Sequence, residues 1–423
     1  MKNNMKKYIL FWLTQAVSNL GSSITSFALT LWLYTVNHSA MQLSLMMFCR
    51  YIPYVVSGPW VGGFVDRHNK KKIMLVCDLV AALCSVTTLA LYLTGELNVW
   101  MICGINTIIG FMNAFQSPAA AVSVGRLVPQ EDISRASGMQ AFSQNLTTML
   151  VPMIASALFA FGGLGAVLAV DLASFAAAFL ILLLFITIPE ISEDKQADQK
   201  YAFRDSLAFV KSKPLLMAAI LVMSVINFVS RITYENTLSP MLLARSGDNS
   251  MVVGAVNTVI GIAGILGGLY VSTRKLKHSP LWLLCIPTLF SFLLGDMIMG
   301  LGQNVVFWCF AGFAAQFFVP MIITGENMIL YGQVPDEMRG QVFAVQNTIQ
   351  FGSIPIGILL GGFLADYVFE PFMANGSPLA VLLAKLVGPG AGSGMAVMFL
   401  CTAVLGSGFC LVSYLKYKKY EQR

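Results

Sequence analysis

Residues 189–213 read PEISEDKQADQKYAFRDSLAFVKSK, and this is the longest charged stretch of the chain. Apolar sequence flanks it on both sides. Charged side chains are costly inside a bilayer, so this stretch belongs in an aqueous compartment if the flanking sequence spans a membrane. It therefore predicts two domains, 1–188 and 214–423, joined by a cytoplasmic central loop at 189–213.

The composition of the flanking sequence indicates a membrane protein. Of the 423 residues, 57% are apolar and only 11% are charged, whereas about a quarter are charged in an ordinary soluble domain. A membrane-spanning helix uses about 20 apolar residues, so twelve helices account for most of this apolar content. The remaining residues suffice only for short loops. We expect no separate catalytic or nucleic-acid-binding domain, and no enzyme activity.

Twelve apolar segments can be counted, six on each side of the central loop. They lie at about 8–35, 40–64, 73–94, 99–125, 135–160, 164–188, 214–243, 251–273, 280–301, 304–332, 340–368 and 393–415. The predicted fold is an all-α membrane protein of twelve transmembrane helices in two six-helix pseudo-symmetric bundles.

The positions of the basic residues predict the orientation, because cytoplasmic loops retain lysine and arginine. With the N-terminus inside, only Arg245 and Lys385 of the 26 basic residues fall outside, and Arg50 and Arg231 fall within spans. Both termini are therefore predicted to be cytoplasmic.

The two halves also share a weak repeat. VPQED at 128–132 and VPDE at 334–337 each precede an arginine, Arg135 or Arg339, at the same place in their half. Such a repeat on the same side of both halves indicates a parallel duplication, an arrangement found in secondary transporters.

The loop after the second segment carries the most specific local signal, GGFVDRHNKKK at 62–72. Gly62 allows close approach of helices, and Asp66 can accept hydrogen bonds from a neighbouring helix N-terminus. Asn69 tolerates the left-handed conformation that a tight loop needs.

This loop resembles motif A of the major facilitator superfamily, Gly-x-Leu-Ala-Asp-Arg-x-Gly-Arg-Lys. Asn69 stands where the family usually has Gly, and Lys70 stands where it usually has Arg. The resemblance implies a gating latch between the halves. The residues assigned to this latch are Gly62, Asp66, Arg67, Lys71 and Asp78.

Within that superfamily, residues 58–79 and the stretch AFQSPA at 114–119 look like the macrolide-efflux branch of bacterial drug:proton antiporters. The motif B arginine of the fourth helix is absent from 104–115, and LVP at 150–152 replaces the antiporter Gly-Pro pair. The resemblance implies export of amphiphilic, macrolide-like drugs across the bacterial plasma (inner) membrane by proton antiport with alternating access. An exporter of an endogenous siderophore or lipid is the alternative, followed by an importer.

Ionisable residues inside spans are functional candidates. Arg231 and Glu235 lie one helical turn apart, so they form either a structural ion pair or a site where Glu235 faces the cavity and exchanges a proton. The other proton-coupling candidates are Asp171, Glu326 and Arg50. Asp296 lies near the predicted outer boundary, where solvation is expected.

The resemblance also implies that the first, fourth, seventh and tenth helices line the substrate cavity. Polar residues on these helices are the substrate-cavity candidates: Gln15, Asn19, Asn113, Gln116, Asn227, Tyr234 and Asn327.

Cofactors are not expected. The eight cysteines all fall inside apolar runs, and no CxxC pair or Cys/His cluster at ligand spacing is present, so no metal site is predicted. The Gly-rich run at 388–394 lacks the lysine of a P-loop, so ATP is not the expected energy source. We expect the partners to be an amphiphilic small molecule, protons and the lipid bilayer, and the protein to be a monomer.

Overall fold

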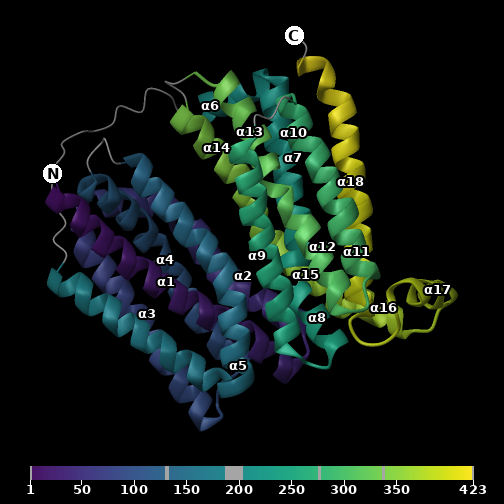
Figure 1. Cartoon of the computed structure of the whole chain (residues 1–423), viewed down its shortest axis with the longest axis horizontal. Helices are drawn as coiled ribbons and strands as arrows, with labels where there is room; N and C mark the ends of the chain where they lie inside the picture. The colour runs from purple at the N-terminus through teal and green to yellow at the C-terminus, as the bar shows by residue number, and fades with distance from the viewer. Residues whose placement is uncertain (1, 129–132, 186–202, 275–277, 336–338, 422–423) are drawn as a thin grey trace. The chain divides into compact units, whose positions relative to one another are not determined.

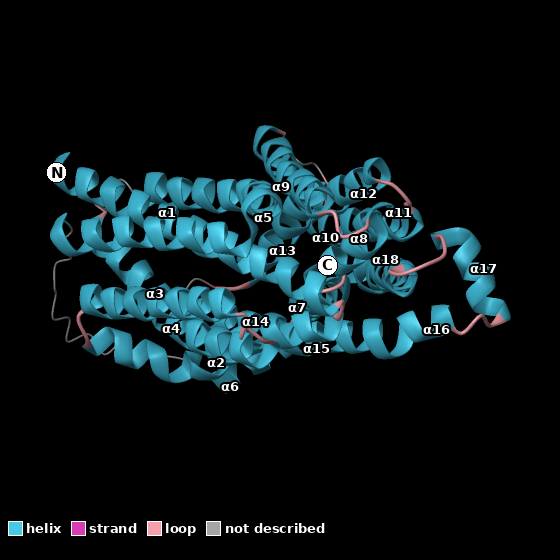
Figure 2. Ribbon diagram, turned by 90° about the horizontal axis from the view of Figure 1, so that it is seen from below, coloured by secondary structure: helices cyan, strands magenta, loops and turns pink. Residues whose placement is uncertain are grey.

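The computed structural model describes residues 2–128, 133–185, 203–274, 278–335 and 339–421. These residues form helices joined by short loops, and none of them lies in a strand (Figure 2). The repeated segments at 128–132 and 334–337 fall largely outside the described residues. The chain separates into two compact units, 1–37 with 42–194, and 38–41 with 195–423.

The N-terminal unit contains five helices, seen in Figure 1 in purple to teal. They are α1 (Lys2–Asn37), α2 (Ala40–Arg67), α3 (Lys70–Thr94), α4 (Val99–Leu127) and α5 (Ile133–Phe185). α1 packs on α5, and α3 packs on α4 and α5. This unit contains a buried hydrophobic core, whose members include Tyr8, Phe11, Met74 and Leu182.

The fifth and sixth predicted segments form the single element α5, which bends at Gly163. The backbone there has φ 65° and ψ −173°, a combination that is essentially restricted to glycine. The helix therefore changes direction at a position where no other residue type fits without strain.

Asn69 does not adopt the expected left-handed conformation. Its φ of −63° and ψ of 114° are extended, and its side chain accepts a hydrogen bond from the Lys72 backbone N–H at 2.9 Å. Asn69 is therefore the N-cap of α3, because an N-cap needs extended backbone and a side-chain acceptor. The expectation of a left-handed turn was wrong, since an asparagine serves either role.

The C-terminal unit, green to yellow in Figure 1, begins with helix α6 inside the predicted central loop. Its elements, with π-helical turns marked η, are α6 (Phe203–Ser212), α7 (Pro214–Ser230), η2 (Arg231–Glu235), α8 (Leu238–Ser246), α9 (Ser250–Thr273), α10 (Pro280–Phe290), η3 (Ser291–Asp296), α11 (Met297–Leu301), α12 (Val305–Phe317), α13 (Val319–Gln333), α14 (Arg339–Gly352), α15 (Ile354–Phe363), η5 (Leu364–Phe369), α16 (Glu370–Ala374), α17 (Pro378–Val387) and α18 (Ser393–Glu421).

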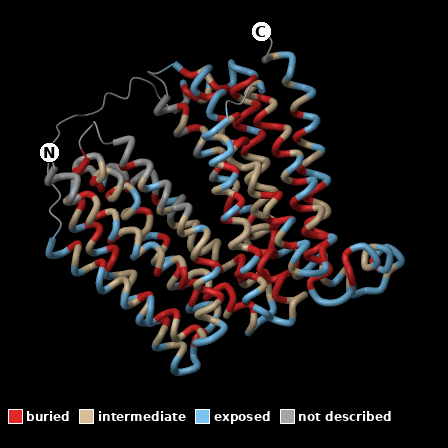
Figure 3. Tube along the Cα trace, viewed as in Figure 1, coloured by how far each residue is buried: buried red, intermediate tan, exposed pale blue. Residues whose placement is uncertain are grey.

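Each unit contains a core of buried apolar residues, and Figure 3 shows which segments of the chain are buried. In the C-terminal unit, α10 packs on α13 and α18, with Leu281, Leu284 and Cys285 fully buried. The described residues include nine helical stretches that are long and apolar enough to cross a membrane. One of these, Leu146–Phe185, has 40 residues and extends through the bend at Gly163. The chain is thus a multi-pass membrane protein, while the count of twelve spans and the cytoplasmic termini stay predictions.

The bend at Gly163 can be tested by substitution. We expect Gly163→Ala to destabilise the protein by about 1–3 kcal/mol, because alanine is strained at this φ and ψ. Gly165→Ala is the matched control, since a Cβ there meets only the Tyr92 ring, at 3.5 Å. Thermal unfolding of both purified variants measures the difference, and equal midpoints would show that α5 does not depend on this glycine.

Candidate functional site

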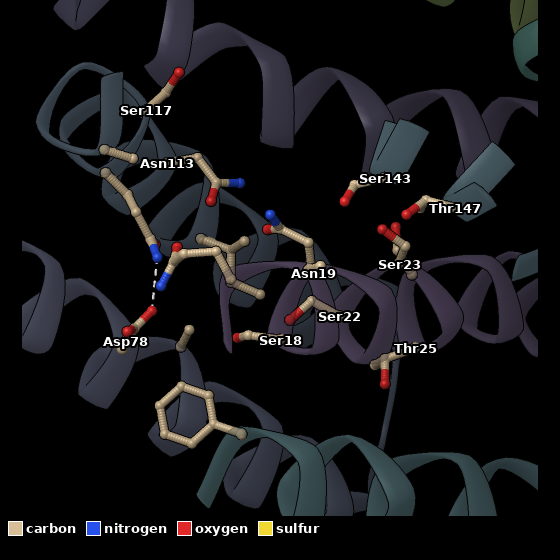
Figure 4. Close-up of a pocket in the computed structure, with 18 of the residues that line it drawn as sticks. Ser18, Asn19, Ser22, Ser23, Thr25, Asp78, Asn113, Ser117, Ser143 and Thr147 are labelled. Atoms are coloured by element: carbon tan, nitrogen blue, oxygen red, sulfur yellow. Dashed lines mark hydrogen bonds between the residues drawn. The ribbon is translucent and has the colours of Figure 1, made fainter. Parts of the chain in front are cut away.

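A polar cavity of about 660 Å³ lies inside the N-terminal unit (Figure 4). All five helices of the unit contribute to its wall. The polar and charged lining residues are Gln15, Ser18, Asn19, Ser22, Ser23, Thr25, Ser26, Arg50, Asp78, Ser85, Asn106, Asn113, Gln116, Ser117, Gln140, Ser143, Thr147, Thr148 and Asp171.

The spacing of these residues explains how helices rich in apolar residues form a polar wall. On α1 the lining residues Gln15, Asn19, Ser22 and Ser26 follow one another at intervals of three and four. Residues at this spacing share one face of a helix. Four of the predicted substrate-cavity residues, Gln15, Asn19, Asn113 and Gln116, line this cavity together.

Several lining residues were not found by sequence reasoning, although a signal existed. Ser22 and Ser26 on α1 and Gln140, Ser143 and Thr147 on α5 stand at intervals of three or four from one another. A polar stripe with helical spacing inside an apolar segment would have identified them.

Asp78 lies in this cavity. Its carboxylate accepts a hydrogen bond from Gln116 Nε2 at 2.6 Å, and the residue is only 4% exposed (Figure 4). Asp78 was assigned to the latch, but its side chain is directed at the α4 amide. The pair brings together a predicted latch residue and a predicted cavity residue.

Asp171 is the second carboxylate in the cavity wall, and it too is 4% exposed. Ser85 Oγ on α3 donates a hydrogen bond to its Oδ2 at 2.8 Å. Gly21 on α1 allows the close approach, because a Cβ at that position would collide with the Ser174 side chain and lie 3.0 Å from Asp171 Oδ1. α1, α3 and α5 are thus held together around this carboxylate.

Arg50 brings a cationic group to the cavity from α2. Its guanidinium donates a hydrogen bond to Ser26 Oγ at 2.6 Å. A charged side chain within a span needs a partner or a water-filled cavity, and the structure places Arg50 at the cavity. Gly110 of α4 packs against the Arg50 backbone carbonyl, where a Cβ would clash.

Asp78 accepts its hydrogen bond from an uncharged amide, and Asp171 accepts one from an uncharged hydroxyl. Among the described residues, the one salt bridge joins Arg231 to Glu235. A buried carboxylate without an ion-pair partner is stabilised less in its charged form than a paired one. The cavity therefore places two carboxylates and the Arg50 guanidinium beside many neutral hydrogen-bonding groups.

An ion pair was one of the two alternatives for Arg231 and Glu235, and the structure contains this contact. The two side chains form a salt bridge within the π-helical turn η2 of the C-terminal unit. Tyr234, between them in sequence, packs edge-to-face on Phe399 with ring centroids 5.4 Å apart.

The remaining predicted residues of the C-terminal unit lie apart from a common site. Glu326 is 5% exposed and accepts hydrogen bonds from Gln346 and Gln350 of α14. Asn327 is exposed, and Asn227 is half-buried with its carbonyl bonded to the Arg231 N–H.

Asp296 was expected to be solvated, and this expectation was wrong. The residue is 1% exposed, and its carboxylate accepts a hydrogen bond from Thr402 Oγ1 of α18 at 2.6 Å. The expectation rested on the position of Asp296 near the predicted outer boundary, and sequence position does not show which neighbouring helix covers a residue. In the structure α18 covers η3 and α10.

The predicted latch is described only in part. The side chains of Gly62, Asp66 and Arg67 lie outside the described residues. Lys71 Nζ donates a hydrogen bond to the Leu183 carbonyl at 2.9 Å, which ties the start of α3 to the end of α5. Cations favour such a helix C-terminus.

No group of three metal-binding side chains occurs within the ranges that the structure describes. The cysteines found there are all free thiols, buried or half-buried.

A double-mutant cycle tests the ion pair. We expect Arg231→Gln and Glu235→Gln each to destabilise the protein, because either substitution leaves one charge uncompensated. The double variant should recover about 1 kcal/mol relative to the sum, since the side chains are 32% and 21% exposed and solvent weakens the pair. Denaturation of the unmodified protein, the two single variants and the double variant in detergent gives the coupling energy. Strictly additive effects would show that the two side chains do not stabilise the protein as a pair.

The chain is similar to known proteins in sequence and in fold. The family model described as Major Facilitator Superfamily matches residues 11–358. The chain is 28% identical over 375 residues to macrolide efflux protein A of Streptococcus pyogenes, covering 86% of this chain and 91% of that protein. It is 24% identical over 371 residues to the staphyloferrin A transporter of Staphylococcus aureus, covering 86% and 90%.

Among solved structures, the fold is similar to a bacterial homolog of the human lysosomal transporter Spinster. The TM-score is 0.74 at 14% identity, over 99% of this chain and 97% of that one. This likeness concerns the fold alone. With the family model covering most of the sequence, the chain belongs to the Major Facilitator Superfamily of membrane transporters.

Proposed function

We propose that this protein is a secondary active transporter that exports hydrophobic or amphiphilic compounds of the macrolide type by proton antiport. The observation that carries the proposal is the cavity of the N-terminal unit, in which the buried Asp78 and Asp171 accept hydrogen bonds from uncharged side chains and Arg50 supplies a cationic group. Similarity to macrolide efflux protein A supports the direction and the substrate class.

The cavity wall suits an amphiphilic substrate. Phe11, Trp12, Leu29, Ile109 and Phe175 contribute apolar surface beside the hydroxyl and amide groups. Pockets that combine apolar walls with a few polar groups bind ligands of drug size. A compound with both a hydrocarbon skeleton and several hydroxyls finds partners for each part here.

The proton is assigned to Asp171 and Asp78. Both carboxylates reach the cavity, and their hydrogen-bond donors, Ser85 and Gln116, are uncharged. Loss of a proton from either one places an extra negative charge in the wall, and gain of a proton removes it. A cationic or polar substrate that binds beside the carboxylate therefore competes with the proton, which is the requirement for antiport.

Glu235 becomes the weaker candidate for the proton. Its carboxylate is engaged in a salt bridge with Arg231, whereas Asp78 and Asp171 line the cavity. In this proposal Arg231 and Glu235 stabilise η2, and Asp296 and Glu326 remain buried acids without an assigned role in coupling.

Export of a siderophore is the second candidate function. Similarity to the staphyloferrin A transporter favours it, and Arg50 at the cavity offers a donor for anionic groups. Import is less favoured, because macrolide efflux protein A is an exporter by its name. In either case we place the protein in the bacterial inner membrane, working as a monomer through alternating access.

Transport into inverted membrane vesicles tests the proposal. An imposed gradient, acid inside, should drive accumulation of a labelled macrolide above the level in vesicles that lack the protein. Asp171→Asn and Asp78→Asn should bind the macrolide yet lose the gradient-driven part. Glu326→Gln is the matched control, because this buried acid lies outside the lining residues of the cavity.

Two results would contradict the proposal. Unchanged gradient-driven accumulation in both aspartate variants would remove the cavity carboxylates from coupling. No accumulation of the macrolide by the unmodified protein, together with accumulation of a labelled carboxylate siderophore, would replace the macrolide by the second candidate substrate.

A further inference from the structure

Helix α17 has a composition unlike that of an ordinary loop helix. Its ten residues, PLAVLLAKLV, include one polar residue, Lys385. At 1.5 Å per residue it is about 15 Å long, which is half of the roughly 30 Å hydrocarbon thickness. It is therefore too short to span a bilayer and too apolar to be stable in water on all sides.

One face of α17 packs on its own unit. The residues on this face are Ala380 and, three, four and seven positions later, Leu383, Ala384 and Val387. Ala380 and Val387 are fully buried. The helix contacts α16, α18 and α11. Ser377 caps its N-terminus by accepting a hydrogen bond from the Ala380 N–H at 3.3 Å.

The loop that carries α17 is fixed to the bundle at both ends. The Glu370 carboxylate accepts hydrogen bonds from the Met395 N–H at 2.9 Å and the Gly392 N–H at 3.3 Å, at the start of α18. The Arg245 guanidinium donates to the Val387 carbonyl, at the end of α17. The position of α17 is thus set by polar contacts.

The other face of α17 is apolar and exposed. Leu379, Leu382 and Leu386 form a second stripe at intervals of three and four, and they are 56%, 56% and 53% exposed. Figure 1 shows α17 projecting sideways from the C-terminal unit, at the end of α18 remote from the C-terminus, and Figure 2 shows the same projection from below. Side chains of this type at the end of a span occupy the boundary between headgroups and acyl chains.

Three features indicate lipid as the cover for this stripe. The helix connects two stretches that are long and apolar enough to cross a membrane. α18, which α17 contacts, also has exposed apolar side chains, with Val404 and Leu405 62% and 65% exposed. Lys385 lies on the flank of the stripe and is long enough to reach a phosphate group while its stem stays in the apolar layer.

We propose that α17 is an interfacial anchor: Leu379, Leu382 and Leu386 insert into the leaflet remote from the C-terminus, and Lys385 contacts lipid phosphate. The anchor fixes the loop between the last two spans, and with it the start of α18, at the depth of the membrane surface. The inference is independent of the transported substrate and of proton coupling.

Fluorescence quenching of an attached probe tests the anchor. Leu382→Cys and Leu386→Cys are labelled with an environment-sensitive dye in vesicles of phosphatidylcholine and phosphatidylglycerol. Two positions on α18 serve as controls: Leu405→Cys for the hydrocarbon and the exposed Lys418→Cys for water. The labelled parent protein, with its buried and half-buried thiols, supplies the background.

Acyl-brominated lipids should quench the α17 probes nearly as well as the Leu405→Cys probe. Iodide in water should quench them about fivefold less than the Lys418→Cys probe, because water is scarce at the depth of the inserted side chains. Iodide quenching equal to that at Lys418→Cys would overturn the proposal. Shielding from both quenchers would also overturn it, since protein, such as a second copy of the chain, would then cover the stripe. The two labelled positions guard against local misfolding of one variant.

Discussion

The hydrocarbon core of a bilayer offers no hydrogen bonds to a protein, and the rest of this structure depends on that constraint. The main chain satisfies it by forming helices throughout the described residues. Charged side chains satisfy it in two ways. Arg231 and Glu235 pair with each other within η2, whereas Asp78 and Asp171 lie at a cavity and accept hydrogen bonds from neutral donors. We propose that only the second arrangement takes part in proton exchange.

We assign a structural role to Glu235, because its carboxylate is engaged by Arg231, and the coupling role to Asp78 and Asp171, because they line the cavity. Asp171 accepts a hydrogen bond from Ser85 and shares its cavity with groups suited to a large ligand. In the proposed antiport, the proton and the ligand compete for one cavity. This requires only the two carboxylates and a cavity that opens alternately to the two sides of the membrane. The same constraint, acting at the membrane surface, explains why the apolar face of α17 remains outside the protein core.

Much of this could be predicted from the sequence. Apolar segments and the charged central stretch predict a helical, multi-pass protein, and the residues of the motif A loop indicate the family that the comparison confirms. Helix rotation could not be predicted, because it depends on partners distant in sequence. Asp296 was placed in solvent for this reason, although Thr402, more than a hundred positions away, covers it. The π-helical turns escaped notice too, since their apolar composition matches that of the α-helices around them. On α1, by contrast, the spacing of Gln15, Asn19 and Ser22 already marks the face that lines the cavity.

The most direct test of the account is the release of protons when substrate binds to the purified protein. A pH-sensitive dye in weakly buffered detergent solution reports this release on addition of a macrolide, with Asp78→Asn/Asp171→Asn as the comparison and Glu326→Gln as the control. The account predicts proton release from the unmodified protein and from the control, and none from the double aspartate variant that still binds the macrolide. Equal release from the double variant would contradict it, because the exchanged proton would then come from a group outside the cavity carboxylates.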